Sequence, residues 1–442
     1  MTPPPRPLGL YTDLYELRML ESYLRLGMTG PATFSLYARA SRARPVLVSA
    51  GLDVALDVLD GFRFGGEEIA YLRAQGISPA ALDWLSSLRP SGELVAVPDG
   101  TVVLAEEPLL ELTAPLPVAQ LLETALTNAI HGATLVATKA ARLVRAARGR
   151  PVIDFGFRRA HGLETGVRAA VSAFVGGAAA TSNVEAGRRF GIPISGTMAH
   201  AFVQAFDREI DALREFAADH ADTTLLVDTY DTLEGVAAAI QVAEELAGRG
   251  QRVGGIRIDS GALGELAAAA RDMLDRAGLR GVQLVASGGL DEGSIDELVR
   301  AGAPYDAFGV GSSLVVSSDR PALDMAYKLV DYAGVGRAKY SPGKHTWPGA
   351  KQVYRRGAPD SDVLELQGAP APDGAPLLAP AWRDGERLYR FDPEEARTRA
   401  QAALAPLPDA WLLPPGPDEP PAPKIGPALA AEAEATRRRF GR

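Results

Sequence analysis

The feature that most constrains the fold is a regular alternation of short apolar segments and helical segments between residues 151 and 330. The apolar segments have the length of buried strands, and segments of helical character, such as Glu234–Leu246 and Leu263–Ala277, separate most of them. Elements that alternate in this way build a parallel sheet, and eight strands are enough to close it into a barrel. The chain is therefore predicted to form an α/β barrel that is closed or nearly closed. The predicted strands are Pro151–Phe155, Gly177–Thr181, Ile192–Ser195, Thr223–Asp228, Gly254–Asp259, Val282–Ser287, Asp306–Val310 and Ala326–Val330.

Polar or glycine-rich residues follow each of the first seven predicted strands. The carboxyl ends of barrel strands meet at one end of the barrel, which is where barrel enzymes carry their catalytic groups. A single aspartate at a strand end usually caps a helix, but seven successive polar ends predict a site. The segments are Asp154-Phe155-Gly156-Phe157-Arg158-Arg159, Thr181-Ser182-Asn183, Ser195 to His200, Asp228 to Asp231, Arg257 to Gly261, Ser287-Gly288-Gly289 and Gly309 to Ser313.

His200 is the candidate nucleophile of this site. It follows a short strand and the turn Ser195-Gly196-Thr197, and the residues from Met198 to Phe206 have helical spacing. His200 is thus expected in the first turn of a helix. Free backbone N–H groups and the positive end of the helix dipole favour an anion there, such as a phosphate carried by the histidine itself. The alternative is a histidine that caps a loop or is hydrogen-bonded in the core.

Two other groups of residues indicate phosphate and metal chemistry. Gly309 and Gly311, with Ser312 beside them, follow the seventh strand and offer backbone N–H groups that no Cβ obstructs, which suits a phosphate. Asp228 and Asp259 supply the hard oxygen ligands that Mg²⁺ prefers, and they could equally hold ribose hydroxyls.

The rest of the chain is expected to form a second, mixed α+β domain. Residues 1–117 combine helices with mainly antiparallel strands, including a hairpin-type turn at Pro98-Asp99-Gly100. Residues 118–335 hold the barrel with the active site. Residues 336–442 are expected to return to the amino-terminal domain and to include a proline-rich tail.

Composition limits the class of protein. The net charge of -9 offers no general attraction for nucleic acid, although a local basic pocket for a small anion remains open. The absence of cysteine excludes disulfides, thiolate metal sites and cysteine nucleophiles. The chain has neither a signal-peptide pattern at its start nor an apolar run of membrane-spanning length, so a cytoplasmic protein is expected.

Eight segments, in the same order over about residues 9–390, resemble the nicotinate phosphoribosyltransferase family. The resemblance implies a reaction of nicotinate with phosphoribosyl pyrophosphate that yields nicotinate mononucleotide and pyrophosphate, with coupled ATP hydrolysis, in NAD salvage. It also implies a type II phosphoribosyltransferase fold and a homodimer with active sites near the subunit interface. The segments are Thr12–Leu17, Glu123–Leu126, Thr138–Arg142, Asp154–Ala160, Ser195–His200, Val227–Thr232, Arg257–Gly261 and Trp347–Arg355.

The resemblance also implies roles for single residues. Phe155 and Tyr15 would sandwich the pyridine ring, with Tyr15 supplied by the same or by a second subunit. Arg158 or Arg159 would meet the carboxylate or a phosphate. In the family, ATP phosphorylates the histidine that His200 matches. Arg257 would contact phosphate, and Asp228 and Asp259 would contact the ribose or Mg²⁺. The segment Ser287-Gly288-Gly289 and the residues Gly309, Gly311 and Ser312 would hold the ribose and its 5′-phosphate. The hydroxyl residues Thr181, Ser195 and Thr197 are also expected to contact substrate.

Ser182 distinguishes between related activities. Related nicotinamide enzymes carry an aspartate at the aligned position, which would repel the carboxylate of nicotinate, so the neutral Ser182 favours the acid. Two residues depart from the family pattern: His161 stands where relatives often have Gln, and Ala262 where many have Asp, which puts one ribose or metal contact in doubt. The alternatives are a nicotinamide- or quinolinate-using phosphoribosyltransferase and a non-catalytic barrel that only binds ligands.

Overall fold

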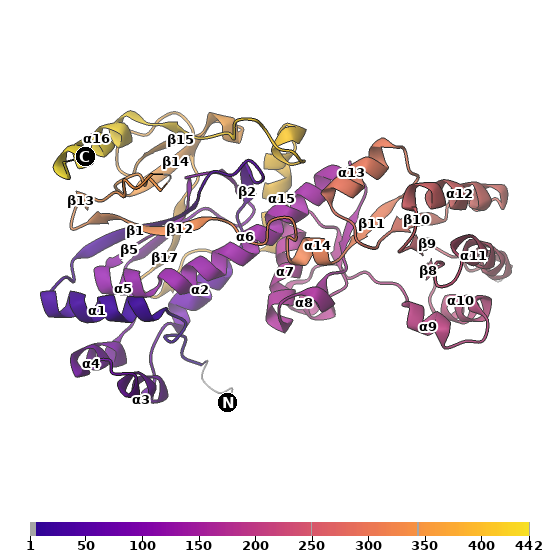
Figure 1. Cartoon of the computed structure of the whole chain (residues 1–442), viewed down its shortest axis with the longest axis horizontal. Coiled ribbons are helices and arrows are strands. Elements are labelled where there is room, and N and C mark those ends of the chain that lie inside the picture. The colour runs from indigo at the N-terminus through magenta and orange to yellow at the C-terminus, as the bar shows by residue number, and fades with distance from the viewer. Residues whose placement is uncertain (1–5, 249, 343, 442) are drawn as a thin grey trace. The chain divides into compact units, whose positions relative to one another are not determined.

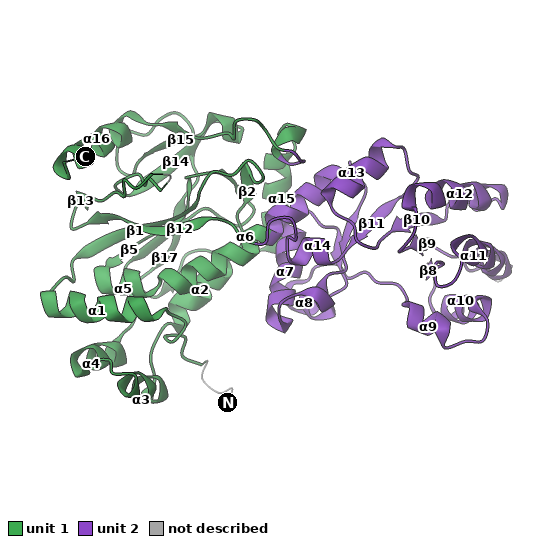
Figure 2. Cartoon of the chain, viewed as in Figure 1, with its two compact units in different colours: residues 1–135, 322–411, 416–442 green, residues 136–321, 412–415 purple. Residues whose placement is uncertain are grey.

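The computed structural model describes residues 6–248, 250–342 and 344–441, and these residues form two compact units (Figure 2). Unit 1 takes the chain up to residue 135, residues 322–411 and the segment from 416 onward, and unit 2 takes residues 136–321 and 412–415. The boundaries predicted after residues 117 and 335 therefore both fall inside unit 1. The first residues of the proline-rich start, 1–5, lie outside the described residues.

Within the described residues, unit 1 is built on a seven-stranded sheet in the order β13-β12-β1-β5-β3-β17-β18, beside the two-stranded sheet β2-β4 (Figure 1). Its core is made of the apolar side chains of the long sheet and of the helices that cover it. The elements before residue 135 are α1 Leu14–Leu26, β1 Pro31–Ala38, β2 Val46–Val48, α2 Leu52–Gly61, α3 Gly66–Ala74, α4 Pro79–Ser87, β3 Glu93–Ala96, β4 Val102–Leu104, β5 Pro108–Pro115, α5 Leu116–Leu121 and the start of α6 Glu123–Ala146.

The eighth predicted barrel strand belongs to unit 1. Residues Met325–Tyr332 form β12, which pairs antiparallel with β1, for example Leu36 with Tyr327. Stacking of the Phe34 and Tyr327 rings, whose centroids lie 4.9 Å apart, fixes this pairing. The prediction that Ala326–Val330 completes the barrel is wrong, because an apolar strand pattern does not specify the sheet that the strand joins.

The predicted hairpin at Pro98-Asp99-Gly100 is also wrong. The strands on its two sides do not pair with each other: β3 pairs with β5 and β17, and β4 pairs with β2. The turn points its aspartate inward instead, where Asp99 Oδ1 accepts a hydrogen bond from the backbone N–H of Leu52 (3.1 Å).

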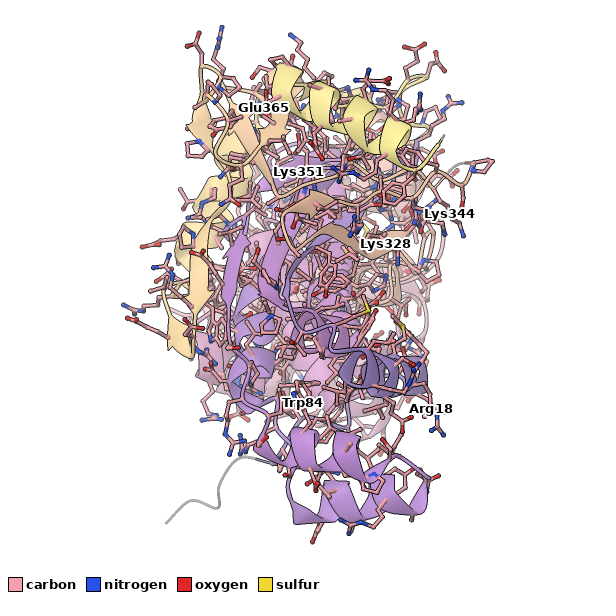
Figure 3. All side chains as sticks on the ribbon, turned by 90° about the vertical axis from the view of Figure 1, so that its left-hand side faces the viewer. Arg18, Trp84, Lys328, Lys344, Lys351 and Glu365 are labelled. Atoms are coloured by element: carbon pink, nitrogen blue, oxygen red, sulfur yellow. The ribbon has the colours of Figure 1, made fainter. Side chains whose placement is uncertain are left out.

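The carboxyl-terminal segment completes unit 1 with a four-stranded sheet, counted over the described residues, in the order β16-β14-β15-β19. Two buried charged residues that Figure 3 labels hold it in place. Lys351 Nζ pairs with Glu111 Oε1 at 3.0 Å, and Glu365 accepts from the backbone N–H of Leu429 at 2.7 Å, in the first turn of α16. The elements are β12, β13 Val335–Gly336, β14 Lys351–Arg355, η2 Pro359–Ser361, β15 Val363–Leu366, β16 Ala375–Pro376, β17 Ala379–Arg383, β18 Glu386–Arg387, α15 Pro393–Leu404, η3 Asp409–Trp411, β19 Lys424–Ile425 and α16 Pro427–Arg439.

In the described residues, unit 2 has a parallel six-stranded sheet in the order β7-β6-β11-β10-β9-β8. The sheet curls but does not close, because β7 and β8 do not pair. The predicted strand Ile192–Ser195 would lie in this gap, and only Ile194 makes a bridge, to Thr181. The expected closed barrel is thus an open, curled α/β sheet. Its strands are β6 Val152–Asp154, β7 Ala180–Thr181, β8 Thr224–Leu226, β9 Gly255–Ile258, β10 Gln283–Ala286 and β11 Ala307–Val310.

Helices follow the strands of unit 2, and their apolar faces form a second core with the sheet. None of the helices in the described part of the chain is long and apolar enough to cross a membrane. The helical elements of this unit, after the end of α6, are η1 Phe157–Arg159, α7 Leu163–Val175, α8 Val184–Phe190, α9 His200–Gln204, α10 Glu209–Asp219, α11 Thr232–Ala247, α12 Leu263–Arg276, α13 Glu292–Arg300 and α14 Ser312–Val315.

Candidate active site

A cleft of about 960 Å³ opens at the carboxyl ends of the strands of unit 2, and unit 2 alone lines it. The location agrees with the expectation for parallel α/β sheets. Most of the residues predicted to bind substrate come together in this cleft. They are Phe155, Arg158, Arg159, Ser182, Ser195, Thr197, His200, Arg257, Asp259, Ser287, Gly288, Gly289, Gly309, Gly311 and Ser312.

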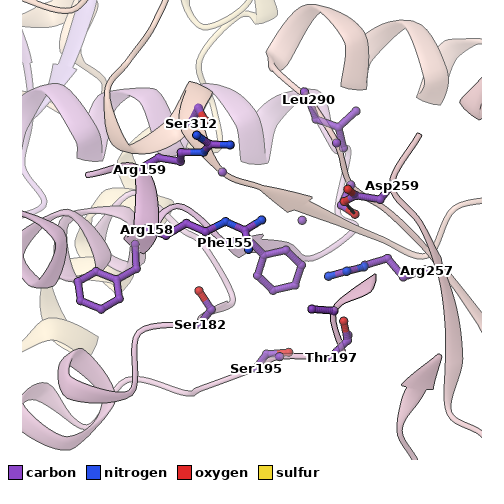
Figure 4. Close-up of a pocket in the computed structure, with 18 of the residues that line it drawn as sticks. Phe155, Arg158, Arg159, Ser182, Ser195, Thr197, Arg257, Asp259, Leu290 and Ser312 are labelled. Carbon is purple, nitrogen blue, oxygen red and sulfur yellow. Dashed lines mark hydrogen bonds between the residues drawn. The ribbon is translucent and has the colours of Figure 1, made fainter. Parts of the chain in front are cut away.

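An aromatic ring with arginines on two sides stands in the cleft. Figure 4 shows the ring of Phe155 between the side chains of Arg158 and Arg257, with Ser182, Ser195 and Thr197 along one edge. The Arg257 guanidinium carbon lies 5.7 Å from the ring centroid, which is a cation–π distance. The cleft therefore offers a flat apolar face and positive charge to the same ligand.

The backbone fixes Phe155 in this position. Its N–H donates to the carbonyl oxygen of Val310 (2.9 Å) at the end of β11, which continues the pairing of β6 with β11. The ring covers Gly309, where any Cβ would overlap the ring atoms. Glycine at position 309 is thus required by the close approach of Phe155.

Asp154 orders the neighbouring loops from behind the cleft. Its carboxylate accepts from the Thr181 hydroxyl (2.7 Å) and from the Gly156 N–H (2.8 Å), and its carbonyl oxygen accepts from the Ser182 N–H (2.8 Å). Burial raises the pKa of Asp154, and these hydrogen bonds partly offset the effect. Thr181 is buried and does not line the cleft, so the structure gives no support to the prediction that it contacts substrate.

The two predicted carboxylates have different positions. Asp259 lines the cleft, and its Oδ1 accepts a hydrogen bond from the Ser287 hydroxyl. Asp228 lies behind it and does not line the cleft; its Oδ2 accepts from the Asp259 N–H (2.9 Å) and the Ser260 hydroxyl (2.6 Å). Asp228 therefore holds the loop that presents Asp259.

Arg257 carries positive charge into a site from which water is partly excluded. Burial lowers the pKa of its guanidinium, with Arg158 acting in the same direction, while Asp259 and Asp228 oppose the shift. An arginine remains a cation under all these influences. One of its terminal nitrogens donates to the carbonyl oxygen of Met198 (3.2 Å), and its buried Nε has no partner among the described residues. Arg257 is therefore a cation with unused donor capacity at the cleft.

His200 lies at the first position of α9, as predicted for the first turn of a helix. Its Nδ1 is 3.1 Å from the Thr229 hydroxyl, which orients the ring, and Nε2 makes no hydrogen bond to the described residues. The helix is only five residues long, so the predicted contribution of its dipole is small. What favours His200 as a nucleophile is its place on the cleft wall and its free ring nitrogen.

Two glycine-rich loops, which lead to Leu290 and Ser312, line the side of the cleft opposite Ser195 and Thr197 in Figure 4. Gly288 has a φ of +88°, and a Cβ there would overlap the backbone carbonyl oxygen of Asp259. In the second loop, Gly311 precedes α14, and Ser312 and Ser313 are the first residues of that helix. The hydroxyl of Ser313, which lines the cleft, is buried without a partner among the described residues. Backbone and hydroxyl donors are therefore free to bind an anion.

Asp259 and Asp228 are the candidate magnesium ligands, and of the two only Asp259 lines the cleft. No group of three or more acidic or histidine side chains suited to a metal occurs in the described residues. Asp228 nevertheless has a buried Oδ1 without a partner among those residues, next to Asp259. Because Mg²⁺ commonly takes one or two carboxylates and completes its shell with water and phosphate oxygens, this pair suits a metal that arrives with a phosphorylated substrate.

Tyr15 belongs to unit 1, on α1. Its side chain is about half exposed, and burial of its hydroxyl, followed by the charge of Glu123, raises its pKa. A role for Tyr15 at the pyridine ring stays a prediction.

The structure adds residues that the sequence did not single out as ligand contacts. Thr229 orients His200, and it stands in the predicted strand-end segment Asp228 to Asp231, so a signal for it was present. Leu290 and Ser318 also line the cleft. Leu290 directly follows the Ser287-Gly288-Gly289 segment, and Ser318 comes several residues after the Gly309–Ser313 segment. No sequence pattern indicated that either would line the cleft.

Comparison with known proteins gives a consistent result. Residues 10–131 match the nicotinate phosphoribosyltransferase N-terminal domain, and residues 151–353 match the nicotinate phosphoribosyltransferase family. A nicotinate phosphoribosyltransferase of Mycobacterium tuberculosis, pncB2, is 47% identical over 407 residues, which is 90% of this chain and 88% of the relative. That of Bacillus subtilis is 43% identical over 358 residues, 79% of this chain and 73% of the relative.

Solved structures share the fold. The structure of human nicotinic acid phosphoribosyltransferase has a TM-score of 0.82 and 26% identity, and the match covers 96% of this chain and 99% of that one. A nicotinate-nucleotide pyrophosphorylase from Pyrococcus furiosus has a TM-score of 0.74 and 25% identity, covering 90% of this chain and 96% of that one.

Proposed function

The chain belongs to the nicotinate phosphoribosyltransferase family, and from this premise we propose that the cleft of unit 2 joins nicotinate to the ribose of phosphoribosyl pyrophosphate, with ATP hydrolysis coupled to the reaction. The product is nicotinate mononucleotide, a precursor in NAD salvage. The observation that carries the proposal is the combination, in one cleft, of an aromatic face between arginines and two loops with free anion-binding donors.

Phe155 and its neighbours suit nicotinate. The flat ring of Phe155 stacks on a pyridine ring, which contributes about 0.5–1.5 kcal/mol beyond the burial of apolar area. Arg158 is the cation we assign to the carboxylate, because it lines the cleft together with Ser182 and Figure 4 shows its side chain on one side of Phe155. Because Ser182 is neutral, it does not repel the carboxylate of nicotinate.

The glycine loops and Arg257 suit the phosphates of the second substrate. The segments at Gly288 and Gly311 would hold the ribose and its 5′-phosphate, and Arg257 would face the pyrophosphate. In the transfer, the lone pair of the pyridine nitrogen forms the bond to C1 of the ribose. The bond from C1 to pyrophosphate breaks, and pyrophosphate keeps both electrons.

Fixed charges around the ribose supply the catalysis. As pyrophosphate departs, positive charge grows on the ribose ring and negative charge on the leaving group. Asp259, an anion that lines the cleft, would stabilise the positive charge on the ribose, and Arg257 would stabilise the negative charge on pyrophosphate. Asp259, with Asp228 behind it, would hold a Mg²⁺ ion, which would supply positive charge to neutralise the leaving group.

His200 is the proposed phosphoryl acceptor from ATP. In the tautomer in which Nδ1–H donates to the Thr229 hydroxyl, Nε2 is the unprotonated, nucleophilic nitrogen, and this is the tautomer that the proposal requires. Attack by Nε2 on the terminal phosphorus of ATP forms an N–P bond, and ADP leaves with the electrons of the broken P–O bond. A homodimer, which the family resemblance implies, and a cytoplasmic location, which was expected from the sequence patterns, remain parts of the proposal.

A nicotinamide- or quinolinate-using enzyme is the nearest alternative. The similarity to a nicotinate-nucleotide pyrophosphorylase means that the fold alone does not choose between pyridine substrates. The neutral Ser182 and the higher identity to nicotinate phosphoribosyltransferases favour nicotinate. The intact set His200, Arg257 and Asp259 speaks against a module that only binds ligands.

The test is to incubate the purified protein with nicotinate, phosphoribosyl pyrophosphate and Mg²⁺, with and without ATP. Equal amounts of nicotinate mononucleotide and pyrophosphate are expected, with more product when ATP is present. His200→Ala should abolish the gain from ATP and the transfer of labelled γ-phosphate to the protein. ATP stimulation that survives in His200→Ala would refute the histidine's role.

A further inference from the structure

A cluster of buried charges lies outside the cleft in unit 2. The side chain of Lys139, on α6, is fully buried. Its ammonium contacts Glu292 Oε2 and lies 2.8 Å from Asp319 Oδ1. Arg142, one helical turn further along α6, donates its Nε to the other oxygen of Glu292 at 2.8 Å. We call these four residues the Lys139 cluster.

The two acidic members of the Lys139 cluster stand at the ends of the two glycine loops. Glu292 is the first residue of α13 and comes two positions after Leu290, which lines the cleft. Asp319 comes directly after Ser318, which also lines the cleft. One ammonium group therefore connects the segment that starts at Gly288 with the segment that starts at Gly311.

Stability alone is a weak reason for such a cluster. Removing a lysine and a glutamate from water costs several kcal/mol per ion, and their attraction only roughly repays this cost. Well-packed apolar residues of similar volume often serve as well or better. An ion pair differs from apolar packing in that it fixes the positions of particular donor and acceptor atoms, and substrate-positioning loops need this property because a misplacement of about 1 Å can cost about 100-fold in rate.

We propose that Lys139 is a positioning residue for phosphoribosyl pyrophosphate. It sets the spacing between the Gly288–Leu290 loop and the Gly311–Ser318 segment, so that donors from both meet the 5′-phosphate together. The inference rests on the proposed function of the cleft. It assigns no substrate contact to Lys139, because the ammonium is engaged with Glu292 and Asp319.

Steady-state kinetics of Lys139→Met and Lys139→Arg test the inference. Lys139→Met should raise the KM for phosphoribosyl pyrophosphate by about 10- to 100-fold, the loss that small misplacements of positioning groups produce. The KM for nicotinate should change much less, because the pairing of β6 with β11 holds Phe155. Lys139→Arg should recover most of the affinity, since a guanidinium can reach both carboxylates.

Two further variants separate positioning from simple loss of stability. Asp319→Asn removes the charge that pairs with Lys139 from the second loop, at a partly exposed side chain, so the fold should survive while the same KM rises by a smaller factor. Lys351→Met is the matched control: it removes another fully buried lysine ion pair, to Glu111, whose contacts lie within unit 1. It should lower the thermal midpoint and leave both KM values unchanged.

The outcomes are distinguishable. If the wild-type protein forms no mononucleotide, the proposed function fails. If the wild type is active and Lys139→Met keeps its KM for phosphoribosyl pyrophosphate, only the inference about Lys139 fails. Equal changes of both KM values in Lys139→Met and Lys351→Met would also overturn it, because they would reflect general destabilisation.

Discussion

At the scale of single residues, Gly288 has the least freedom in the site. Its φ of +88° and its contact with the Asp259 carbonyl oxygen both exclude a Cβ. Gly288→Ala should therefore displace the loop, remove nearly all mononucleotide formation and lower the thermal midpoint. Gly278→Ala is a suitable control, because Gly278 has a similar φ of +76° but open space around it. If Gly288→Ala lost no more activity and stability than Gly278→Ala, the close approach of Gly288 to the Asp259 carbonyl oxygen would be contradicted.

We expect Ser182 to select the pyridine substrate. Ser182→Asp places a carboxylate beside the site proposed for the carboxylate of nicotinate, and like charges repel strongly where water is excluded. We expect the KM for nicotinate to rise about 10- to 100-fold, comparable to the loss of one charge-assisted hydrogen bond. Ser182→Asn, similar in size to aspartate but neutral, should have a much smaller effect. Similar KM values for the two variants would show that charge at this position does not select the substrate.

Strand-end position predicted which residues gather at the site but not which way each side chain points. Phe155 and Arg257 line the cleft as expected, whereas Thr181 and Asp228 do not line it and instead make hydrogen bonds that hold its wall. The reason is that successive residues of a strand point to opposite sides, and the turn after the strand resets this alternation. The sequence does not encode that orientation in any simple period.

At the scale of elements, Asp231 is the N-cap residue of α11 and comes two positions after Thr229, whose hydroxyl contacts His200. Its Oδ1 accepts from the N–H groups of Leu233 and Glu234, both at 3.0 Å, as an N-cap residue does. Asp231→Ala should reduce stability by about 1 kcal/mol, and Asp231→Asn should restore most of it. Calorimetric thermal unfolding measures both. Equal midpoints for the alanine variant and the wild type would exclude a capping role.

The order and type of the barrel elements could be predicted, but their pairing could not. Six of the eight predicted strands correspond to β6, β7, β8, β9, β10 and β11 of the described unit 2, although β7 covers only the end of the predicted strand Gly177–Thr181. The segment Ile192–Ser195 makes only one bridge, and Ala326–Val330 pairs with β1 in unit 1. Apolar patterns report burial, and burial occurs equally in either sheet. The choice of partner comes from long-range packing such as that of Phe34 on Tyr327.

At the scale of the whole molecule, Asp99 makes stability depend on pH. Asp99 is fully buried, and burial, followed by the charge of Asp53, raises its pKa from 3.8 to about 7. The folded state thus holds a proton that the unfolded state has lost between about pH 4 and 7. In this range stability falls as pH rises, by up to about 1.4 kcal/mol per pH unit for one proton.

Asp99→Asn removes this titration and keeps the shape of the side chain. Relative to the wild type, its thermal midpoint should rise between pH 5 and pH 8, because only the wild type must ionise a buried carboxyl. Tyr389, whose hydroxyl lies 3.0 Å from Asp99 Oδ2, can accept a hydrogen bond from the new amide. A difference in midpoint that stays constant over this range would show that Asp99 does not titrate there.

The return of the carboxyl-terminal segment to the amino-terminal region was expected, but its anchors were not. Lys351 holds the segment against Glu111 of the amino-terminal region, and Glu365 joins β15 to the start of α16 within the segment. A basic stretch followed by short strands indicated only that the segment folds back. Buried ion pairs between residues 240 positions apart leave no local pattern in the sequence.

The ratio of kcat/KM for nicotinate to kcat/KM for nicotinamide, measured on one preparation with phosphoribosyl pyrophosphate and Mg²⁺, tests the central claim most directly. A carboxylate bound by an arginine and a neutral Ser182 should favour nicotinate by about 10- to 100-fold. A ratio near or below one would contradict the assignment of the cleft to nicotinate.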